Sequence, residues 1–75
     1  MNHSLVERRI LEWVRAVKAD PAYFGVLSTG QKCAVALVLD SPELIAWWGT
    51  ALDCVDRLDQ GWFHACLNVQ RNKEF

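Results

Sequence analysis

Four helix-start signals lie along this chain of 75 residues: Ser4 with Glu7, Asp20 with Pro21, Ser28 with Gln31, and Ser41 with Pro42 and Glu43. A Ser or Asp side chain before a helix accepts hydrogen bonds from the free backbone N–H groups of the first turn, and a Glu or Gln three residues later can bond back to the cap. Proline at the first helical position loses no hydrogen bond. These signals predict an all-α fold, a compact bundle of four to six short helices forming one helical domain over residues 1–75.

The first helix is predicted over residues 5–19. Its apolar side chains recur three or four positions apart, as in an amphipathic helix: Val6, Ile10, Trp13, Val14 and Val17. The residue before Asp20-Pro21 is pushed towards a turn, so this helix is expected to end at Ala19. A short helical turn is expected over residues 21–24, ending at Gly25.

Residues 33–39 form an uninterrupted apolar run, Cys-Ala-Val-Ala-Leu-Val-Leu. Periodicity alone does not distinguish a buried strand from a buried helix in such a run. The pairing of Ser28 with Gln31 upstream, the two Ala residues in the run and the lack of a partner strand favour a helix over residues 29–39. A carboxylate introduced at Val35 or Leu37 is therefore expected to unfold the protein.

Shorter helices are expected in the second half of the chain. Pro42 starts one that Gly49-Thr50 interrupts, and Thr50 with Asp53 caps the next, whose apolar side chains are Ala51, Leu52, Val55 and Leu58. Asp59-Gln60-Gly61 is expected to break the chain again, by a cap or by a left-handed turn. The last helix is predicted over residues 62–69, and residues 71–75 are predicted to be a frayed tail.

Composition and charge exclude several classes of protein. The formal net charge of −1 gives no electrostatic argument for binding nucleic acid. Three widely spaced cysteines do not make the framework of a disulfide-stapled secreted domain. No apolar run approaches the length of a membrane span, and the first residues carry charges where a signal peptide needs an apolar stretch. The chain is expected to be a soluble, cytoplasmic protein that does not bind membranes.

No catalytic residue, metal site or cofactor is predicted, and the chain is not expected to be an enzyme. His64 and Cys66 lie two residues apart, which points their side chains about 200° from each other on a helix and suits neither a shared metal nor a nucleophilic pair. Asp53 and Asp56 can share one helix face, but they lie in a charged run typical of a solvated surface. Residues 28–32 contain Gly-Gln-Lys where a phosphate-binding loop has Gly-Lys-Ser or Gly-Lys-Thr, so a helix cap explains them better.

Surface apolarity is the feature that points to a function. The chain is 52% hydrophobic and has four Trp residues, which are too many to bury fully in one small protomer. Trp47 and Trp48 are adjacent, so they diverge by about 100° on a helix and are either wedged between helices or placed at an interface. The acidic stretch around them is either a solvated face or a patch for a basic partner. We therefore expect a protein-binding module, whose partner is another protein or a second copy in a homodimer, with the partner-binding residues Trp47, Trp48, Asp53 and Asp56.

A second hypothesis is a dimeric, nucleic-acid-associated regulator. It would use the basic side chains of the first predicted helix: Arg8, Arg9, Arg15 and Lys18. A recognition helix in a helix-turn-helix protein carries exposed Arg, Lys, Asn or Gln, whereas the candidate second helices here are apolar or acidic. Nucleic acid is therefore the less favoured partner.

The segment Leu-Ser-Thr-Gly-Gln-Lys-Cys-Ala-Val-Ala-Leu-Val-Leu, residues 27–39, resembles small proteins encoded by proteobacterial genomes and their phages. Those proteins share the pattern Leu-Ser/Thr-x-Gly-x-Lys-x-Ala-Val-Ala-Leu-Val-Leu. The resemblance, followed by a Trp-rich acidic helix, covers about half of the chain. The resemblance implies a phage or mobile-element setting, and it carries no activity or cofactor with it. Together with the expected protein binding, it gives the hypothesis of a phage or mobile-element factor that modulates a host protein.

Overall fold

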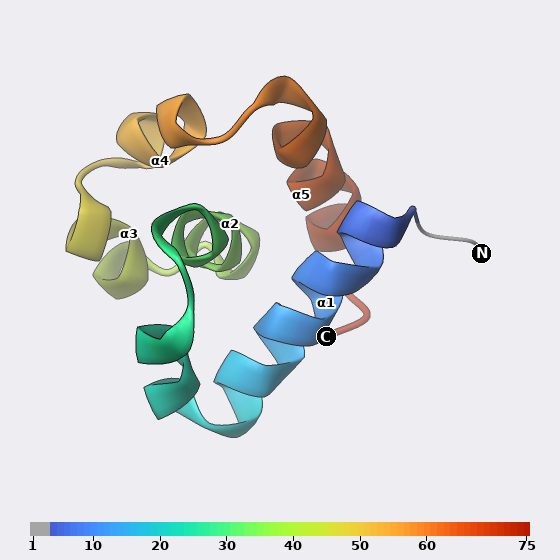
Figure 1. Cartoon of the computed structure of the whole chain (residues 1–75), viewed down its shortest axis with the longest axis horizontal. Helices are drawn as coiled ribbons and strands as arrows, with labels where there is room; N and C mark the ends of the chain where they lie inside the picture. The colour runs from blue at the N-terminus through green and yellow to red at the C-terminus, as the bar shows by residue number, and fades with distance from the viewer. Residues whose placement is uncertain (1–3) are drawn as a thin grey trace.

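Six helices account for most of residues 4–75, the part of the chain that the computed structural model describes (Figure 1). They are α1 (Leu5–Ala19), the 3-10 helix η1 (Pro21–Val26), α2 (Thr29–Leu39), α3 (Pro42–Trp48), α4 (Ala51–Arg57) and α5 (Gln60–Asn72). No strand occurs among these residues, and the fold measures 32 × 27 × 18 Å. The predicted all-α bundle is confirmed.

Each of the four predicted helix starts carries a side-chain cap. Ser4 Oγ accepts a hydrogen bond from the backbone N–H of Glu7 at 3.2 Å, and Asp20 Oδ1 accepts from the N–H of Ala22 at 3.1 Å. Ser41 Oγ accepts from Leu44 N–H in the same manner. Ser28 forms a full capping box, in which the Gln31 side chain accepts from the Ser28 N–H at 3.0 Å. Local side-chain chemistry therefore places these helix starts where the sequence predicts them.

Helix α2 lies at the centre of the fold. It packs against α1, α3, α4 and α5, and Figure 1 shows it nearly end-on with the other helices around it. Residues 33–36 and Val38 are buried. A helix enclosed on most sides has no polar face, which explains why an apolar run of residues forms it. The prediction of a helix over residues 29–39 is confirmed.

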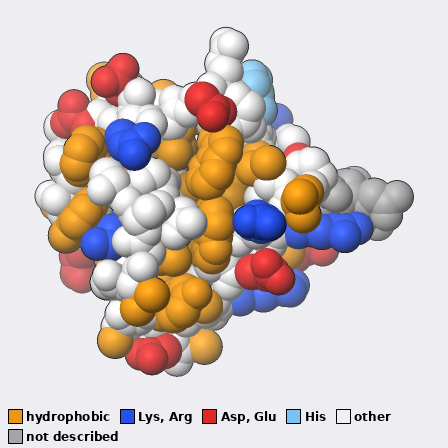
Figure 2. Space-filling model, in the orientation of Figure 1, with side chains coloured by type: hydrophobic (Ala, Val, Ile, Leu, Met, Phe, Trp, Pro, Cys, Tyr) orange, Lys and Arg blue, Asp and Glu red, His pale blue; other side chains and the backbone are white. Residues whose placement is uncertain are grey.

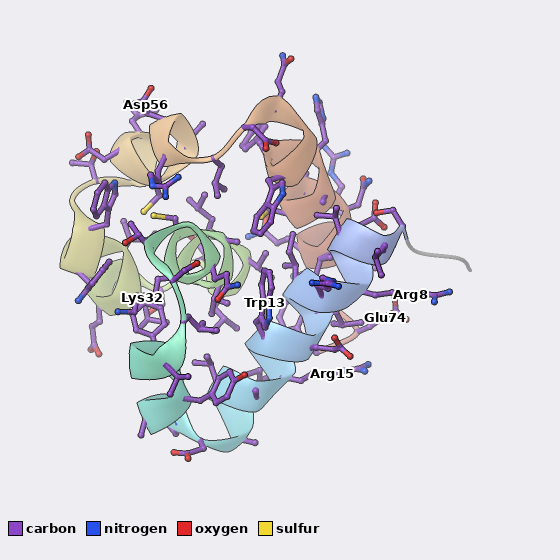
Figure 3. The ribbon with its side chains drawn as sticks, in the orientation of Figure 1. Arg8, Trp13, Arg15, Lys32, Asp56 and Glu74 are labelled. Carbon is purple, nitrogen blue, oxygen red and sulfur yellow. The ribbon has the colours of Figure 1, made fainter. Side chains whose placement is uncertain are left out.

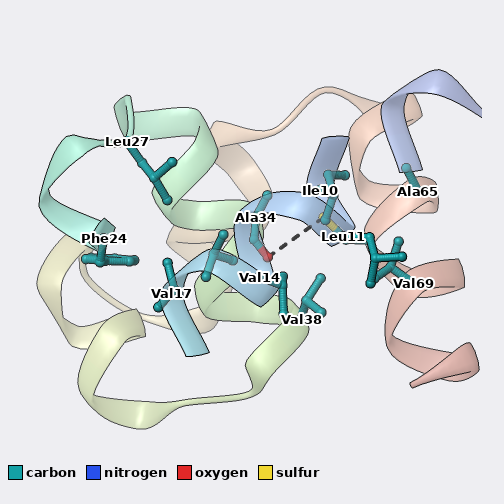
Figure 4. Close-up of a cluster of buried hydrophobic side chains, with 12 residues drawn as sticks. Ile10, Leu11, Val14, Val17, Phe24, Leu27, Ala34, Val38, Ala65 and Val69 are labelled. Carbon is teal, nitrogen blue, oxygen red and sulfur yellow. Dashed lines mark hydrogen bonds between the residues drawn. The ribbon is translucent and has the colours of Figure 1, made fainter. Parts of the chain in front are cut away.

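The core is formed where α1, α2 and α5 meet (Figure 4). The apolar stripe of α1, with Ile10 and Val14 fully buried, packs against α2 and α5. Cys66 on α5 lies 4.0 Å from the carbonyl oxygen of Ala34 on α2, with its thiol donating. The half-buried rings of Trp13 and Trp62 stack at 5.5 Å between α1 and α5. These contacts join the first and last helices of the chain.

The predicted boundaries of two helices were wrong. The helical turn after Asp20 runs to Val26 instead of ending at Phe24. Helix α5 begins at Gln60, because the Asp59 side chain accepts from the Trp62 N–H at 2.8 Å and makes Gln60 and Gly61 part of the first turn. It also continues three residues beyond Val69, to Asn72.

The frayed tail predicted for residues 71–75 is also wrong. The guanidinium of Arg15 donates to the carbonyl oxygen of Glu74, at 2.7 Å from one nitrogen. The ammonium of Lys18 donates to the carbonyl oxygen of Phe75 at 3.0 Å and lies 5.3 Å from the centre of its ring. Phe75 itself packs against the core. Contacts with α1 therefore hold residues 71–75 in place, although their polar composition is typical of a disordered terminus.

Helices α3 and α4 are peripheral. Helix α3 has no buried residue, and Cys54 is the only buried residue of α4. Gly49 and Thr50 separate the two helices, and a Cβ atom at position 49 would collide with the Asp53 carboxylate, so another residue there would displace that carboxylate from its capping position. Within residues 4–75, no helix has both the length and the apolarity needed to cross a membrane.

Candidate protein-binding surface

An exposed apolar surface runs over α3 and α4. We call it the tryptophan face and define it by Trp47, Trp48 and Leu52 together with the carboxylates of Asp53 and Asp56. The side chains of Trp47 and Trp48 are 50% and 44% exposed, and that of Leu52 is 80% exposed. In Figure 2 hydrophobic side chains lie on the left of the molecule, over these helices, with acidic side chains beside them. The prediction that the four Trp residues are not all fully buried is confirmed.

The two indoles belong to an aromatic cluster. The rings of Trp47 and Trp48 stack with their centres 6.2 Å apart, and Trp47 meets the ring of Phe24 edge to face at 6.1 Å. The ammonium of Lys32 lies 4.1 Å from the centre of the Trp47 ring and 5.7 Å from that of Phe24. Figure 3 shows Lys32 in the space between η1 and α3. One face of the cluster therefore already holds a cation.

A hydrogen bond and a capping box fix the second indole. Trp48 Nε1–H donates to the carbonyl oxygen of Asp53 at 3.3 Å. The carboxylate of Asp53 accepts from the backbone N–H of Thr50 at 2.8 Å and from its hydroxyl at 3.0 Å. These two bonds, the backbone one foremost, lower the pKa of Asp53 below its ordinary value of 3.8. Asp53 therefore serves mainly to hold α4 in place beneath Trp48.

Asp56 has no such partner. Its carboxylate accepts no hydrogen bond within residues 4–75, and it projects outward from α4 in Figure 3. It lines an open depression of about 440 Å³ together with Trp48, Asp53 and Arg57. The structure thus brings the four predicted partner-binding residues together on one side of the molecule, and leaves one carboxylate free next to an exposed ring.

The four basic residues of the alternative surface are all exposed on α1, but they are not all free. Arg15 and Lys18 donate to the carbonyl oxygens of residues 74 and 75. Arg8 and Arg9 lie at the other end of the helix, and the acidic Glu12 lies between the two pairs. In Figure 3 Arg8 and Arg15 project away from the core. No continuous basic surface results.

The cysteines are buried and protonated. The thiols of Cys33 on α2 and Cys54 on α4 interact with each other, and burial is the largest cause that raises the pKa of Cys33 to about 11 and raises the pKa of Cys54. Burial raises the pKa of Cys66 to about 12. Protonated, buried thiols are poor nucleophiles and poor metal ligands. His64 is exposed whereas Cys66 is buried, and residues 4–75 contain no group of three His, Cys, Asp or Glu side chains arranged for a metal ion.

Sequence reasoning missed two residues of this surface. Lys32 reaches Trp47 only because α2 and α3 fold against each other, and no local pattern signals that contact. The sequence places Leu52 among the apolar side chains of α4 without indicating which of them is exposed, and the structure buries Cys54 and leaves Leu52 exposed. Cys54 and Leu58 lie four positions apart and both face inward, and Leu52 lies two positions before Cys54, on the opposite side of the helix. The spacing of Cys54 and Leu58 is the signal that identifies Leu52 as exposed.

Comparison of the chain with protein-family models, with curated proteins and with solved structures finds no match.

Proposed function

We propose that this protein is a non-enzymatic protein-binding module that docks through the tryptophan face. The observation that carries the proposal is the pair of adjacent indoles, Trp47 and Trp48, each about half exposed on a helix without a buried residue. Tryptophan is strongly enriched among the residues that contribute most to binding energy at interfaces. Exposed apolar area next to a charged rim is typical of such a surface.

The geometry of the two rings supports the proposal further. Trp47 contacts both Lys32 and the ring of Trp48, and Trp48 is hydrogen-bonded to the Asp53 carbonyl. A side chain already held in one conformation loses little entropy when a partner covers it. The face is therefore preorganised, and most of the free energy released by covering the rings remains available for affinity.

The rival function, a dimeric regulator bound to nucleic acid through α1, has weaker support. Two of its four basic side chains, Arg15 and Lys18, already hold the C-terminal segment. Phosphate binding requires several free cations on one surface. The resemblance of residues 27–39 to small phage and proteobacterial proteins extends our proposal to a phage or mobile-element factor that binds a host protein.

A peptide-display selection tests the proposed function. A library of random 16-residue peptides is selected on the folded protein, and the enriched peptides are measured against the wild type, Trp47→Ala and Trp48→Ala. We expect the enriched peptides to lose at least about tenfold in affinity with each variant, because truncating a central Trp at an interface removes about 2 kcal/mol or more.

The matched control is Trp13→Phe, which alters an indole on the opposite side of α2 and leaves the tryptophan face intact. It should bind the enriched peptides as the wild type does. Circular dichroism spectra establish that each variant is folded. Enriched peptides that bind both Ala variants with wild-type affinity would show that the face is not the binding surface, and the proposal would fail.

A further inference from the structure

The part of the chain that contains the tryptophan face is strongly acidic. Residues 40–59 carry five carboxylates and one cation, Arg57, which gives a net charge of −4. The five carboxylates all belong to exposed residues: Asp40, Glu43, Asp53, Asp56 and Asp59. Helix α1, in contrast, carries four basic and two acidic side chains, a net charge of +2. The apolar surface therefore lies in the acidic half of a protein whose total charge is near zero.

This charge distribution argues against a second copy of the chain as the occupant of the face. A two-fold dimer presents the same patch from both subunits, so the exposed carboxylates near Trp48 would face one another. Like charges at an interface cost several kcal/mol and suppress pairing. A contact of the acidic face with the basic α1 of another copy would be head-to-tail, and it would build rings or open chains instead of a two-fold dimer.

The molecule itself shows which chemistry the aromatic cluster accepts. The ammonium of Lys32 lies over the ring of Trp47 at 4.1 Å and near Phe24. A cation over an indole is held by the negative face of the ring, and tryptophan is the strongest such partner among the aromatic residues. The same arrangement is open at Trp48, since this residue stays 44% exposed.

The depression beside Trp48 supplies the matching anion. Asp56 lines it and accepts no hydrogen bond within residues 4–75, whereas Asp53 is already bound by Thr50. Arg57 also lines the depression, but its guanidinium lies over the first turn of α2, at 3.7 Å from the position that a Cβ of Gly30 would take. An incoming cation thus meets an indole ring and a carboxylate that no internal hydrogen bond occupies.

We propose that the tryptophan face binds a cationic amphipathic segment of another protein, with one Lys or Arg side chain of that segment seated between Trp48 and Asp56. Apolar side chains of the segment cover Trp47 and Leu52. The inference rests on the proposed function, since it names the class of partner that the same surface takes. Electrostatic attraction to the acidic rim sets the rate of association and the choice of partner, and the covered rings supply most of the affinity.

Two designed peptides of 15 residues test the inference: an amphipathic helix of Leu and Lys, and one with Glu at every Lys position. Each is titrated into ¹⁵N-labelled protein, in which four Trp side chains give separate indole N–H signals. We expect the Leu/Lys peptide to shift the Trp47 and Trp48 signals and to leave those of Trp13 and Trp62 in place. The Leu/Glu peptide should bind at least about tenfold more weakly.

Charge-removing variants locate the contact. Asp56→Asn should weaken the binding of the Leu/Lys peptide about threefold to tenfold, because one carboxylate next to a partly desolvated cation is removed. The matched control Glu12→Gln removes the same charge from α1 and should change the affinity by less than about twofold. Raising the salt concentration should weaken the wild type more than Asp56→Asn.

The two proposals fail in different ways. If both peptides shift the Trp47 and Trp48 signals with equal affinity, or if Asp56→Asn binds as the wild type does, the cationic partner is wrong while protein binding through the face stands. If these signals move with protein concentration alone, the occupant is a second copy, and the inference is again wrong. If neither peptide shifts them although displayed peptides bind through the face, the partner class is wrong and the proposed function survives.

Discussion

The helices of this protein divide into two regions that use apolar residues in opposite ways. In α1, α2 and α5 the apolar residues meet in a closed core that includes Ile10, Val14 and Val69. In α3 and α4 the large apolar side chains Trp47, Trp48 and Leu52 stay at the surface, and only Cys54 is fully buried. The first region accounts for stability, and the second displays its largest side chains to the solvent. A chain of 75 residues can thus keep an exposed surface apolar only because its core is completed elsewhere.

Helix length explains the difference. Helices α3 and α4 have seven residues each, about two turns, whereas α1 has 15 and α5 has 13. Two turns give about three or four positions that face the same neighbour, half as many as the longer helices offer, so a short helix buries only a small apolar stripe. The caps of Ser41 and Thr50 hold these helices in shape without a core of their own.

The largest expected effect is a carboxylate placed in each region. Val35→Asp should unfold the protein, because Val35 is fully buried in α2 and an unpaired buried carboxylate costs several kcal/mol against a stability of about 5 kcal/mol. Leu52→Asp, the same kind of change at an exposed position of α4, should leave the fold intact. Thermal unfolding followed by circular dichroism measures both.

Leu37 gives an intermediate case. It lines an open depression of about 210 Å³ between α2 and α5, where water can reach a carboxylate. Leu37→Asp should therefore lower the melting temperature without unfolding the protein at room temperature, which revises the expectation drawn from the apolar run. A Leu52→Asp variant as unstable as Val35→Asp would show that exposed apolar residues of α4 stabilise the fold as much as buried residues of α2 do.

Thiol reactivity compares the two regions at a finer level. A variant that keeps only Cys54 (Cys33→Ala, Cys66→Ala) should react with a disulfide reagent at pH 8 at least about tenfold faster than one that keeps only Cys66 (Cys33→Ala, Cys54→Ala). Opening the short helix α4 exposes Cys54, whereas Cys66 requires opening of the core and has its pKa raised to about 12. Absorbance of the released thiolate follows both reactions.

The control for that comparison is the rate in a denaturant. Both variants should react alike when unfolded, because the environment of each thiol is then the solvent. Equal rates in the folded state would mean that α4 opens only together with the core, and the two regions would behave as one cooperative unit.

The smallest expected effect concerns pH and the capping box of α4. The pKa of Asp53 is lower in the folded protein than its ordinary 3.8, so its contribution to stability is complete above that pH and is lost as the pH falls below it through the lowered value. The backbone N–H signal of Thr50 should move in this range, and the indole N–H of Trp48 should follow it. The indole N–H signal of Trp13 should stay in place over the same pH range. A Trp13 signal that moves together with Trp48 would mean that acid loosens the whole fold and not α4 alone.

Local chemistry made most of the fold predictable. The caps at Ser4, Asp20, Ser28 and Ser41 each depend on residues within one turn, so the sequence alone indicates where the helices begin. The helix over residues 29–39 followed from the cap that precedes it. The fold of residues 71–75 was not predictable, because their order depends on Arg15 and Lys18, far away in the chain.

The tryptophan face was predictable only in part, because its geometry also depends on contacts between residues far apart in the chain. The adjacency of Trp47 and Trp48 shows that both cannot face one neighbour, but which side stays open depends on where α2 and η1 lie. The place of Lys32 over Trp47 and the burial of Cys54 instead of Leu52 come from tertiary packing. The position of Lys32 has no signal in the local sequence. The burial of Cys54 has one, its four-residue spacing from Leu58.

The contact between the first helix and the last one bears on how the protein is made. The Asn68 side chain donates to the Glu7 carboxylate at 3.0 Å, and Arg15 donates to Glu74, across 61 and 59 positions of sequence. A chain emerges from the ribosome from its N-terminus, at about 5–20 residues per second. The apolar stripe of α1 therefore stays without its contacts to α5 for several seconds, until residues 60–75 have been synthesised. Once residues 47–56 have also been synthesised, and until α5 folds, the nascent chain exposes both this stripe and the tryptophan face to chaperones.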